Sequence, residues 1–123
     1  MSFRDKMKVG VSNAEYKLLI ALSRAGLTQS LGITTQKPIH LLDPCPEYPH
    51  GLDTKPDYRS DMVQWVGFLD NVKLHKGSRM EKDEVKDDLL RGMGWRVSRW
   101  PYSPPLSDRR LGEIVEEVRR LKA

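Results

Sequence analysis

The chain has 123 residues with 38% hydrophobic and 31% charged side chains, a composition that predicts one globular domain, residues 1–123, and excludes a disordered or fibrous chain. Its formal net charge of +4 favours polyanionic partners such as DNA, while the single cysteine, Cys45, excludes an internal disulfide. No apolar run is long enough to span a bilayer and no apolar segment follows the basic start MSFRDKMKVG, so we expect a cytoplasmic protein that has no membrane partner.

The first half of the chain contains three recognisable segments. Ser12-Asn13-Ala14-Glu15 is a capping box and predicts a helix that ends near Gly26. Residues 36–42 predict a short strand, and Pro38 favours a position at a sheet edge or at the start of the strand. Residues 43–56 hold four prolines and one glycine, and this composition predicts a long loop.

The second half alternates strands and helices. Residues 56–62 and 64–70 predict a hairpin, residues 78–93 a helix, residues 95–100 a strand and residues 107–122 a final helix. A strand, a helix and a further strand form a right-handed crossover, so the second strand of the hairpin and the last strand should be parallel neighbours. The whole order predicts an α/β sandwich around a small mixed sheet flanked by helices.

Aromatic side chains are concentrated on the two central strands. Trp65 and Phe68 are predicted to lie in the core, and so are Trp95 and Val97, because a central strand buries its apolar side. The alternation of tryptophan and arginine in WRVSRW is also compatible with nucleic-acid bases stacking on Trp95 and Trp100.

Titratable side chains gather where the most hydrophobic strand ends. The stretch VGFLDNVKLH, residues 66–75, turns from apolar to polar at Asp70, and Asp57 lies in the neighbouring predicted strand, residues 56–62. In a hairpin both carboxylates can reach the same rim of the sheet, and two carboxylates suit Mg²⁺ (or Mn²⁺), which also keeps water and phosphate oxygens. Such a cation activates water towards a phosphodiester, with Lys73 or His75 orienting or deprotonating the nucleophile.

Six short segments carry a combined pattern. They are Glu15, Gln36-Lys37-Pro38-Ile39, Pro56-Asp57, Asp70-Asn71-Val72-Lys73-Leu74-His75, Lys82-Asp83 and Gly94-Trp95-Arg96-Val97-Ser98-Arg99. In this order they resemble the PD-(D/E)xK nucleases, and among these the very-short-patch-repair endonucleases and related mobile-element (homing-type) nucleases. The resemblance covers about residues 12–100, with the helix of residues 107–122 beyond it, and implies a restriction-endonuclease-like sandwich.

The resemblance also implies a role for each matched side chain. Asp57 would be the principal metal ligand, and Asp70 falls where the family has either an acid or a histidine and would be the second ligand. His75 would act as a general base or charge stabiliser. Glu15 and Asp83 would be acidic partners that orient the histidine, the water or the metal.

The chain departs from the family pattern at three points. Asn71 stands in place of the usual glycine, and Leu74 in place of the aromatic that often precedes the histidine. The structural zinc site of the mismatch-repair members needs several cysteines, and this chain has only Cys45. The resemblance therefore does not extend to mismatch specificity.

Each candidate residue also has an ordinary structural explanation. Glu15 completes the capping box, and Asp83 lies in the first turn of a helix, where an acid favours the macrodipole. Asp57 is a loop residue if its strand begins later, and Asp70 can belong to the turn that ends its strand. His75 alone would be a surface histidine. Their joint occurrence in the family order favours the catalytic interpretation.

The function predicted from these features is a metal-dependent DNA endonuclease. Lys73, Lys76 and Arg79 flank the site and are predicted to contact DNA phosphates. At this size, long recognition or double-strand cleavage would need a homodimer or a larger nucleoprotein complex. Two alternatives remain open: a DNA-binding module that keeps the nuclease fold without chemistry, and an interaction subunit that uses the apolar stripe of the last helix.

Overall fold

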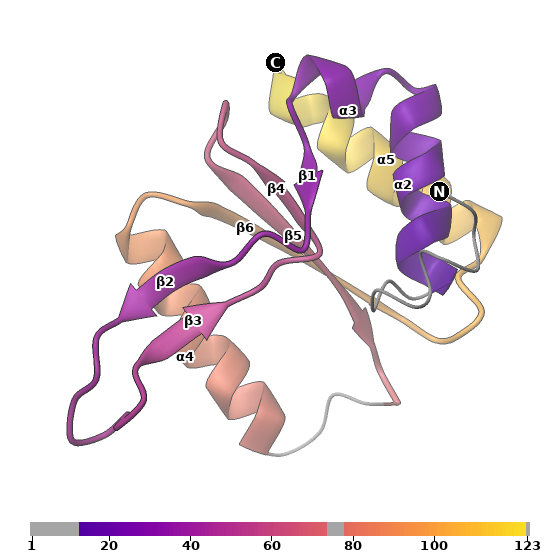
Figure 1. The fold of residues 1–123 in the computed structure, drawn as a ribbon. Coiled ribbons are helices and arrows are strands. Elements are labelled where there is room, and N and C mark those ends of the chain that lie inside the picture. Colours follow the sequence, from indigo (N-terminus) through magenta and orange to yellow (C-terminus); the bar gives the residue numbers. More distant parts are fainter. Residues whose placement is uncertain (1–12, 74–77, 123) are drawn as a thin grey trace.

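The computed structural model of the protein describes residues 13–73 and 78–122 (Figure 1). Its helices are α2 (Asn13–Arg24), α3 (Leu27–Ser30), α4 (Ser78–Gly92) and α5 (Asp108–Arg119), with a final 3₁₀ turn, η1 (Arg120–Lys122). Its strands are β1 (Thr34–Thr35), β2 (Ile39–Leu42), β3 (Leu52–Thr54), β4 (Tyr58–Ser60), β5 (Trp65–Asn71) and β6 (Arg96–Tyr102). The fold is therefore mixed α/β, as the sequence pattern predicts.

The central sheet has four strands in the order β1-β4-β5-β6. The predicted hairpin is present, because β4 and β5 pair antiparallel with Tyr58 opposite Gly67. The predicted crossover is present as well: α4 connects β5 to β6, and these strands pair in parallel from Trp65 opposite Arg96 to Asn71 opposite Tyr102. The carboxyl ends of β5 and β6 thus lie side by side, which is where ligands collect in such sheets.

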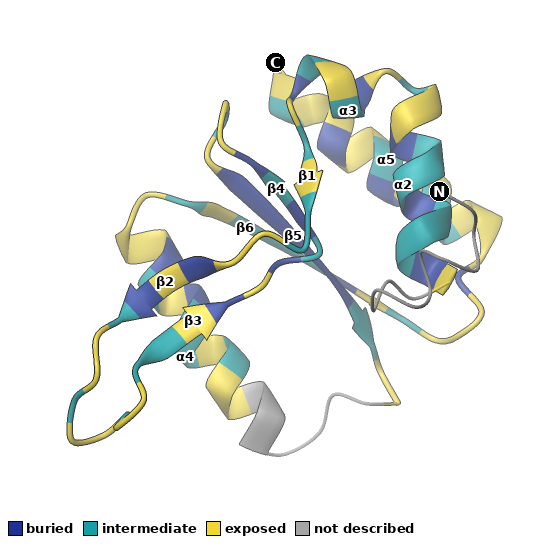
Figure 2. Cartoon of the chain, in the orientation of Figure 1, coloured by how far each residue is buried: buried dark blue, intermediate teal, exposed yellow. Residues whose placement is uncertain are grey.

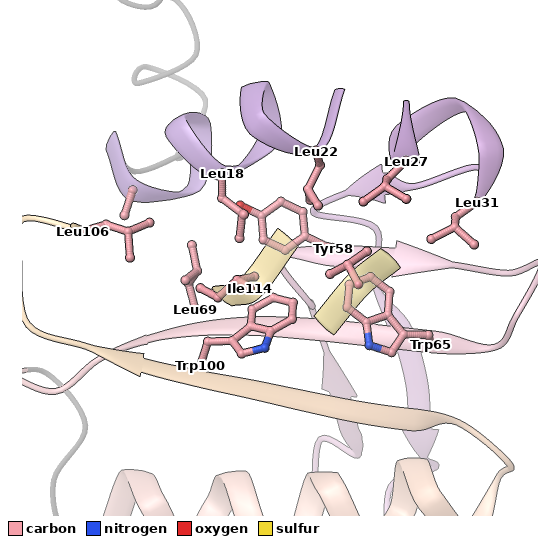
Figure 3. Close-up of a cluster of buried hydrophobic side chains, with 12 residues drawn as sticks. Leu18, Leu22, Leu27, Leu31, Tyr58, Trp65, Leu69, Trp100, Leu106 and Ile114 are labelled. Atoms are coloured by element: carbon pink, nitrogen blue, oxygen red, sulfur yellow. The ribbon is translucent and has the colours of Figure 1, made fainter. Parts of the chain in front are cut away.

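Helices cover the sheet on both sides (Figures 1 and 2). On one side α2, α3 and α5 enclose the larger core cluster, in which the rings of Tyr58, Trp65 and Trp100 lie against Leu18 and Leu22 of α2 (Figure 3). On the other side α4 and the β2–β3 pair cover a smaller cluster of five buried residues: Ile39, Leu41, Val66, Phe68 and Leu90. Alternate residues of β5 supply both clusters, so this strand is buried on both faces.

The tryptophans of the central strands belong to the packing. Trp65 and Phe68 are buried as predicted. Trp95 and Val97 are partly buried against the smaller cluster, while Trp100 is buried in the larger one on the opposite face of β6. Stacking of nucleic-acid bases on Trp100 is therefore incompatible with its place in the core.

The apolar stripe of the last helix is also used inside the molecule. Ile114 and Val118 of α5 are each 1% exposed and lie in the larger cluster, and Leu111 and Val115 pack against it. Ser107 caps this helix as its pattern suggests, since the Ser107 hydroxyl accepts a hydrogen bond from the Arg110 backbone N–H. The described part of α5 leaves little of the stripe for another protein.

The prediction of one long loop at residues 43–56 is wrong. The segment contains β3, which pairs antiparallel with β2 in a separate two-stranded sheet. Strand β3 is three residues long and has one large apolar side chain, Leu52, so alternation gave no signal. The first helix also ends earlier than expected, at Arg24; Gly26, with a φ of 74°, joins α2 to α3. Among the described residues, no helix has the length and apolar character needed to cross a membrane.

Candidate functional site

Asp57 lies just before β4, beside the end of β5. Its Oδ2 atom accepts a hydrogen bond of 2.7 Å from the backbone N–H of Leu69 in β5. The carboxylate therefore satisfies a main-chain donor of the central strand. Asp57 is outside the strand that follows it, as one of the two sequence interpretations allows, but this bond fixes its side chain at the edge of the sheet.

Glu15 meets Asp57 at this point. The side-chain amide of Gln36 donates to Glu15 Oε2 at 2.9 Å and to Asp57 Oδ1 at 3.4 Å. The two carboxylates come from the first turn of α2 and the start of β4, and Gln36 lies between β1 and β2. Gln36 has a φ of 56°, a left-handed conformation that is uncommon for residues other than glycine and that clusters at functional sites.

The surroundings disfavour negative charge on Asp57. Burial raises the pKa of Asp57, and the nearby charge of Asp70 raises it further, although the bonds from Leu69, Glu15 and Gln36 act in the opposite direction. Burial also raises the pKa of Tyr102, with a further contribution from the charges of Glu15 and Asp57. Two acids and a phenol thus lie within electrostatic reach of one another at the carboxyl ends of the parallel strands.

Asp70 is engaged by Arg99 on the α4 side of the sheet. The Nη1 atom of Arg99 lies 3.1 Å from Asp70 Oδ1 and 3.3 Å from its Oδ2. The same guanidinium binds Asp87 through two bonds of 2.6 and 2.8 Å, and its Nη1 lies 3.7 Å from Asp83 Oδ2. Its centre stands 4.1 Å from the centroid of the Phe68 ring. Arg99 therefore joins α4 to the ends of β5 and β6.

The charge of this arginine is maintained by its neighbours. Burial alone lowers the pKa of Arg99, but the bonds to Asp87 and the charges of Asp70 and Asp83 raise it above its ordinary value. A cavity of about 370 Å³ opens beside the guanidinium and is lined by Asp70, Val72, Asp83, Glu84, Asp87, Arg99 and Pro101. Asp70 was predicted to share a metal ion with Asp57, but in the structure it is bridged to Asp83 by a cation of the chain itself, Arg99.

The structure describes only some of the predicted basic residues. Lys73 is exposed, and its backbone N–H donates to Asn71 Oδ1 at 3.0 Å. His75 and Lys76 lie outside the described residues, and Arg79 lies in α4 but its side chain is outside what the structure describes. Their proposed contacts with a nucleophile or with phosphates stay predictions.

Sequence reasoning missed Gln36, Asp87 and Arg99 as parts of these networks. The spacing of Asp83 and Asp87, four residues apart on one helix, was a usable signal, since such residues share a face. Arg99 could have been paired with that face from the parallel register, in which it lies opposite Phe68. No local signal indicates that Gln36 bridges two carboxylates, because the contact depends on how α2 packs on the sheet.

Only some of the acidic side chains described at this end of the sheet suit a divalent cation. Within residues 13–73 and 78–122, no group of three or more His, Cys, Asp or Glu is placed to hold a metal ion. Mg²⁺ often needs only one or two carboxylates, because it keeps several waters and takes phosphate oxygens from the substrate. Asp57 and Glu15 fit that role. A cation bound at Asp70 would have to replace an existing ion pair with Arg99.

Comparison with known proteins does not assign the chain to a family. Family models, curated proteins and solved structures gave no match to the chain. The chemistry of the carboxylate pair and its surroundings is therefore the basis on which a function is assigned.

Proposed function

We propose that the protein is a metal-dependent DNA endonuclease with a restriction-endonuclease-like fold of the PD-(D/E)xK class. The order of elements supports this proposal: a helix that carries Glu15, a hairpin that follows Asp57 and contains Asp70 near its end, and a crossover helix that leads to a parallel strand. The net charge of +4 is compatible with a polyanionic substrate.

One observation carries the proposal. Two carboxylates from separate elements share a single amide donor at the end of the sheet, where burial raises the pKa of Asp57. Holding two acids together in a partly buried place disfavours the charged state of both, and such arrangements cluster at functional sites. A structural role would be served as well by one acid, whereas a pair gives a hard cation its preferred ligands.

The side chains have the following roles in this proposal. Asp57 and Glu15 are the acidic ligands, and Gln36 orients both through its amide. A bound Mg²⁺ supplies an activated water and offsets the charge that develops on the phosphodiester. Lys73 and His75 follow the end of β5 and assist the nucleophile, as the sequence resemblance implies. Asp70 contributes negative charge from β5 and is oriented by Arg99.

The test is a cleavage assay with plain, nicked, mismatched and branched DNA in Mg²⁺ or Mn²⁺. We expect the wild-type protein to cut at least one substrate and Asp57→Asn to reduce the rate by about 100-fold or more, because the substitution removes a ligand charge and keeps the shape. Asp88→Asn is the matched control, since Asp88 has an 81% exposed side chain on α4. Cleavage by Asp57→Asn at the wild-type rate, or no cleavage by either protein, contradicts the proposal.

The Arg99 network favours one alternative, a DNA-binding module without chemistry. The ion pair between Asp70 and Arg99 leaves the second expected metal ligand already neutralised. Such a module would bind DNA with a steep dependence on salt, would cut nothing, and would bind equally well after Asp57→Asn. The same panel therefore separates the two functions.

A further inference from the structure

A second pocket lies at the carboxyl ends of β5 and β6, next to the first turn of α2. Its volume is about 420 Å³, and its walls include Asn13, Lys17, Asn71, Tyr102, Pro104 and Pro105. Asn71 and Tyr102 are register partners, and the backbone N–H of Val72 donates to the Tyr102 carbonyl at 3.0 Å. The wall formed by the ends of the two strands is therefore held by the sheet itself.

The first turn of α2 connects the pocket to the carboxylate pair. Ala14 lines the pocket, and the next residue, Glu15, shares the Gln36 amide with Asp57. A group bound in the pocket would thus lie at the same end of the sheet as the two carboxylates.

The charges around the pocket select against an anion. Among the described residues of its wall Lys17 is the basic one, and its Nζ donates to the Leu106 carbonyl at 2.9 Å and lies 3.1 Å from Asp108 Oδ1. Its charge is therefore already compensated, and the neighbouring carboxylates repel a phosphate. A neutral ligand fits these surroundings better than a charged one.

The chemistry of the wall identifies the class of this neutral ligand. The side-chain amides of Asn13 and Asn71 offer both donors and acceptors, as base edges require. The Tyr102 ring and the rings of Pro104 and Pro105 offer flat apolar surface, and bases taken out of a helix stack on such groups. Amide edges together with flat faces suit a planar heterocycle.

We propose that this pocket binds a single unstacked nucleobase of the DNA strand whose phosphate lies at the Glu15–Asp57 pair. That the ligand belongs to a DNA strand with its phosphate at the carboxylate pair rests on the proposed function. That the pocket prefers a base rests on the residues of the pocket alone. A base paired inside a duplex cannot enter, whereas an unpaired base enters without the cost of breaking a pair. The substrate class is therefore DNA with an unpaired or single-stranded nucleotide next to the cleaved bond.

The first test uses nuclear magnetic resonance and needs no cleavage. Asn13 and Asn71 are the only two asparagines in the sequence, so Asn13→Ala and Asn71→Ala assign their side-chain amide signals. Deoxyadenosine should shift both signals in a saturable way, and 2-deoxyribose should not. The amide of Gln29, exposed on α3, should stay in place with either ligand. Equal shifts with both ligands, or none with the nucleoside, overturn the proposal.

The second test uses DNA that differs by one base. Binding without divalent cations is compared for a strand with one unpaired adenine and the same strand with an abasic site there. The wild-type protein should prefer the adenine by about tenfold, and Tyr102→Leu should abolish the preference by removing the stacking ring. Equal losses on both strands would indicate a structural role and overturn the base pocket. A base preference without cleavage in the panel overturns only the proposed function, and cleavage without a base preference overturns only the pocket.

Discussion

At the scale of single residues, Gly67 shows how tightly the core behind the site is packed. The rings of Trp65 and Trp100 lie 5.8 Å apart between centroids, and a Cβ atom on Gly67 would stand 2.7 Å from each ring. A glycine in the middle of a strand usually weakens it, and here the close approach of two indoles explains why it is present.

Gly67→Ala should therefore destabilise the protein by about 1–3 kcal/mol, because neither indole can move without disturbing the cluster. Gly112→Ala is the matched control, since a Cβ at that exposed position of α5 meets nothing within 4 Å. The control should be neutral or more stable by about 0.5–1 kcal/mol, as expected for glycine in a helix. Urea unfolding measures both changes, and equal stabilities of Gly67→Ala and wild type would contradict the packing described above.

At the scale of elements, His40 links β2 to β3 through ion pairs with Asp53 and Asp43, which we call the His40 clip. The His40 ring on β2 faces two carboxylates, with Nδ1 2.8 Å from Asp53 Oδ1 on β3 and Nε2 2.8 Å from Asp43 Oδ1. The side-chain hydrogen bond to Asp53, followed by that to Asp43, raises the pKa of His40 above its ordinary 6.5. Both bonds use the ring fully only when both nitrogens carry protons.

This clip predicts a dependence of stability on pH. Because the pKa of His40 is higher in the folded than in the unfolded state, its contribution is fully present below pH 6.5 and is lost as the pH rises through the folded pKa. We expect His40→Gln to be less stable than wild type at pH 5.5 and equally stable well above the folded pKa. Ring-proton titration should show the pKa of His40 falling in Asp53→Asn and unchanged in Asp88→Asn. An ordinary pKa of His40 in the wild-type protein would rule out the clip.

The elements also show which features could be predicted from sequence. Hairpin β4–β5 and crossover α4 follow from apolar periodicity and capping residues, which are local. Strand β3 does not, because its three residues, Leu52–Thr54, are stabilised by pairing with β2 and not by a pattern of their own. Glu15 and Asp57 were both named as candidates, yet their contact through Gln36 depends on tertiary packing and has no sequence signature.

At the scale of the whole molecule, side chains from the α2 side and from the α4 side meet at the carboxyl ends of β5 and β6. The Glu15–Asp57 pair and the proposed base pocket lie at this end with α2, while the Arg99 network lies on the α4 side. Arg99 binds residues of α4 and β5 from its own place on β6, so one guanidinium connects three consecutive elements of the chain. Arg99 therefore stabilises the fold and also holds Asp70 at the end of β5.

Arg99→Ala should accordingly destabilise the whole fold by roughly 3 kcal/mol, because it leaves Asp87, with a side chain only 9% exposed, as an uncompensated buried charge. The double variant Arg99→Ala, Asp87→Ala removes that charge as well and should recover part of the loss. Arg91→Ala is the control: its ion pair with Asp88 joins side chains that are 58% and 81% exposed, and such pairs contribute at most about 1 kcal/mol. Thermal and urea unfolding measure these variants and the single variant Asp87→Ala. If the double variant is as unstable as the sum of its single substitutions, then Arg99 and Asp87 are not coupled, and the network does not connect α4 to the parallel strands.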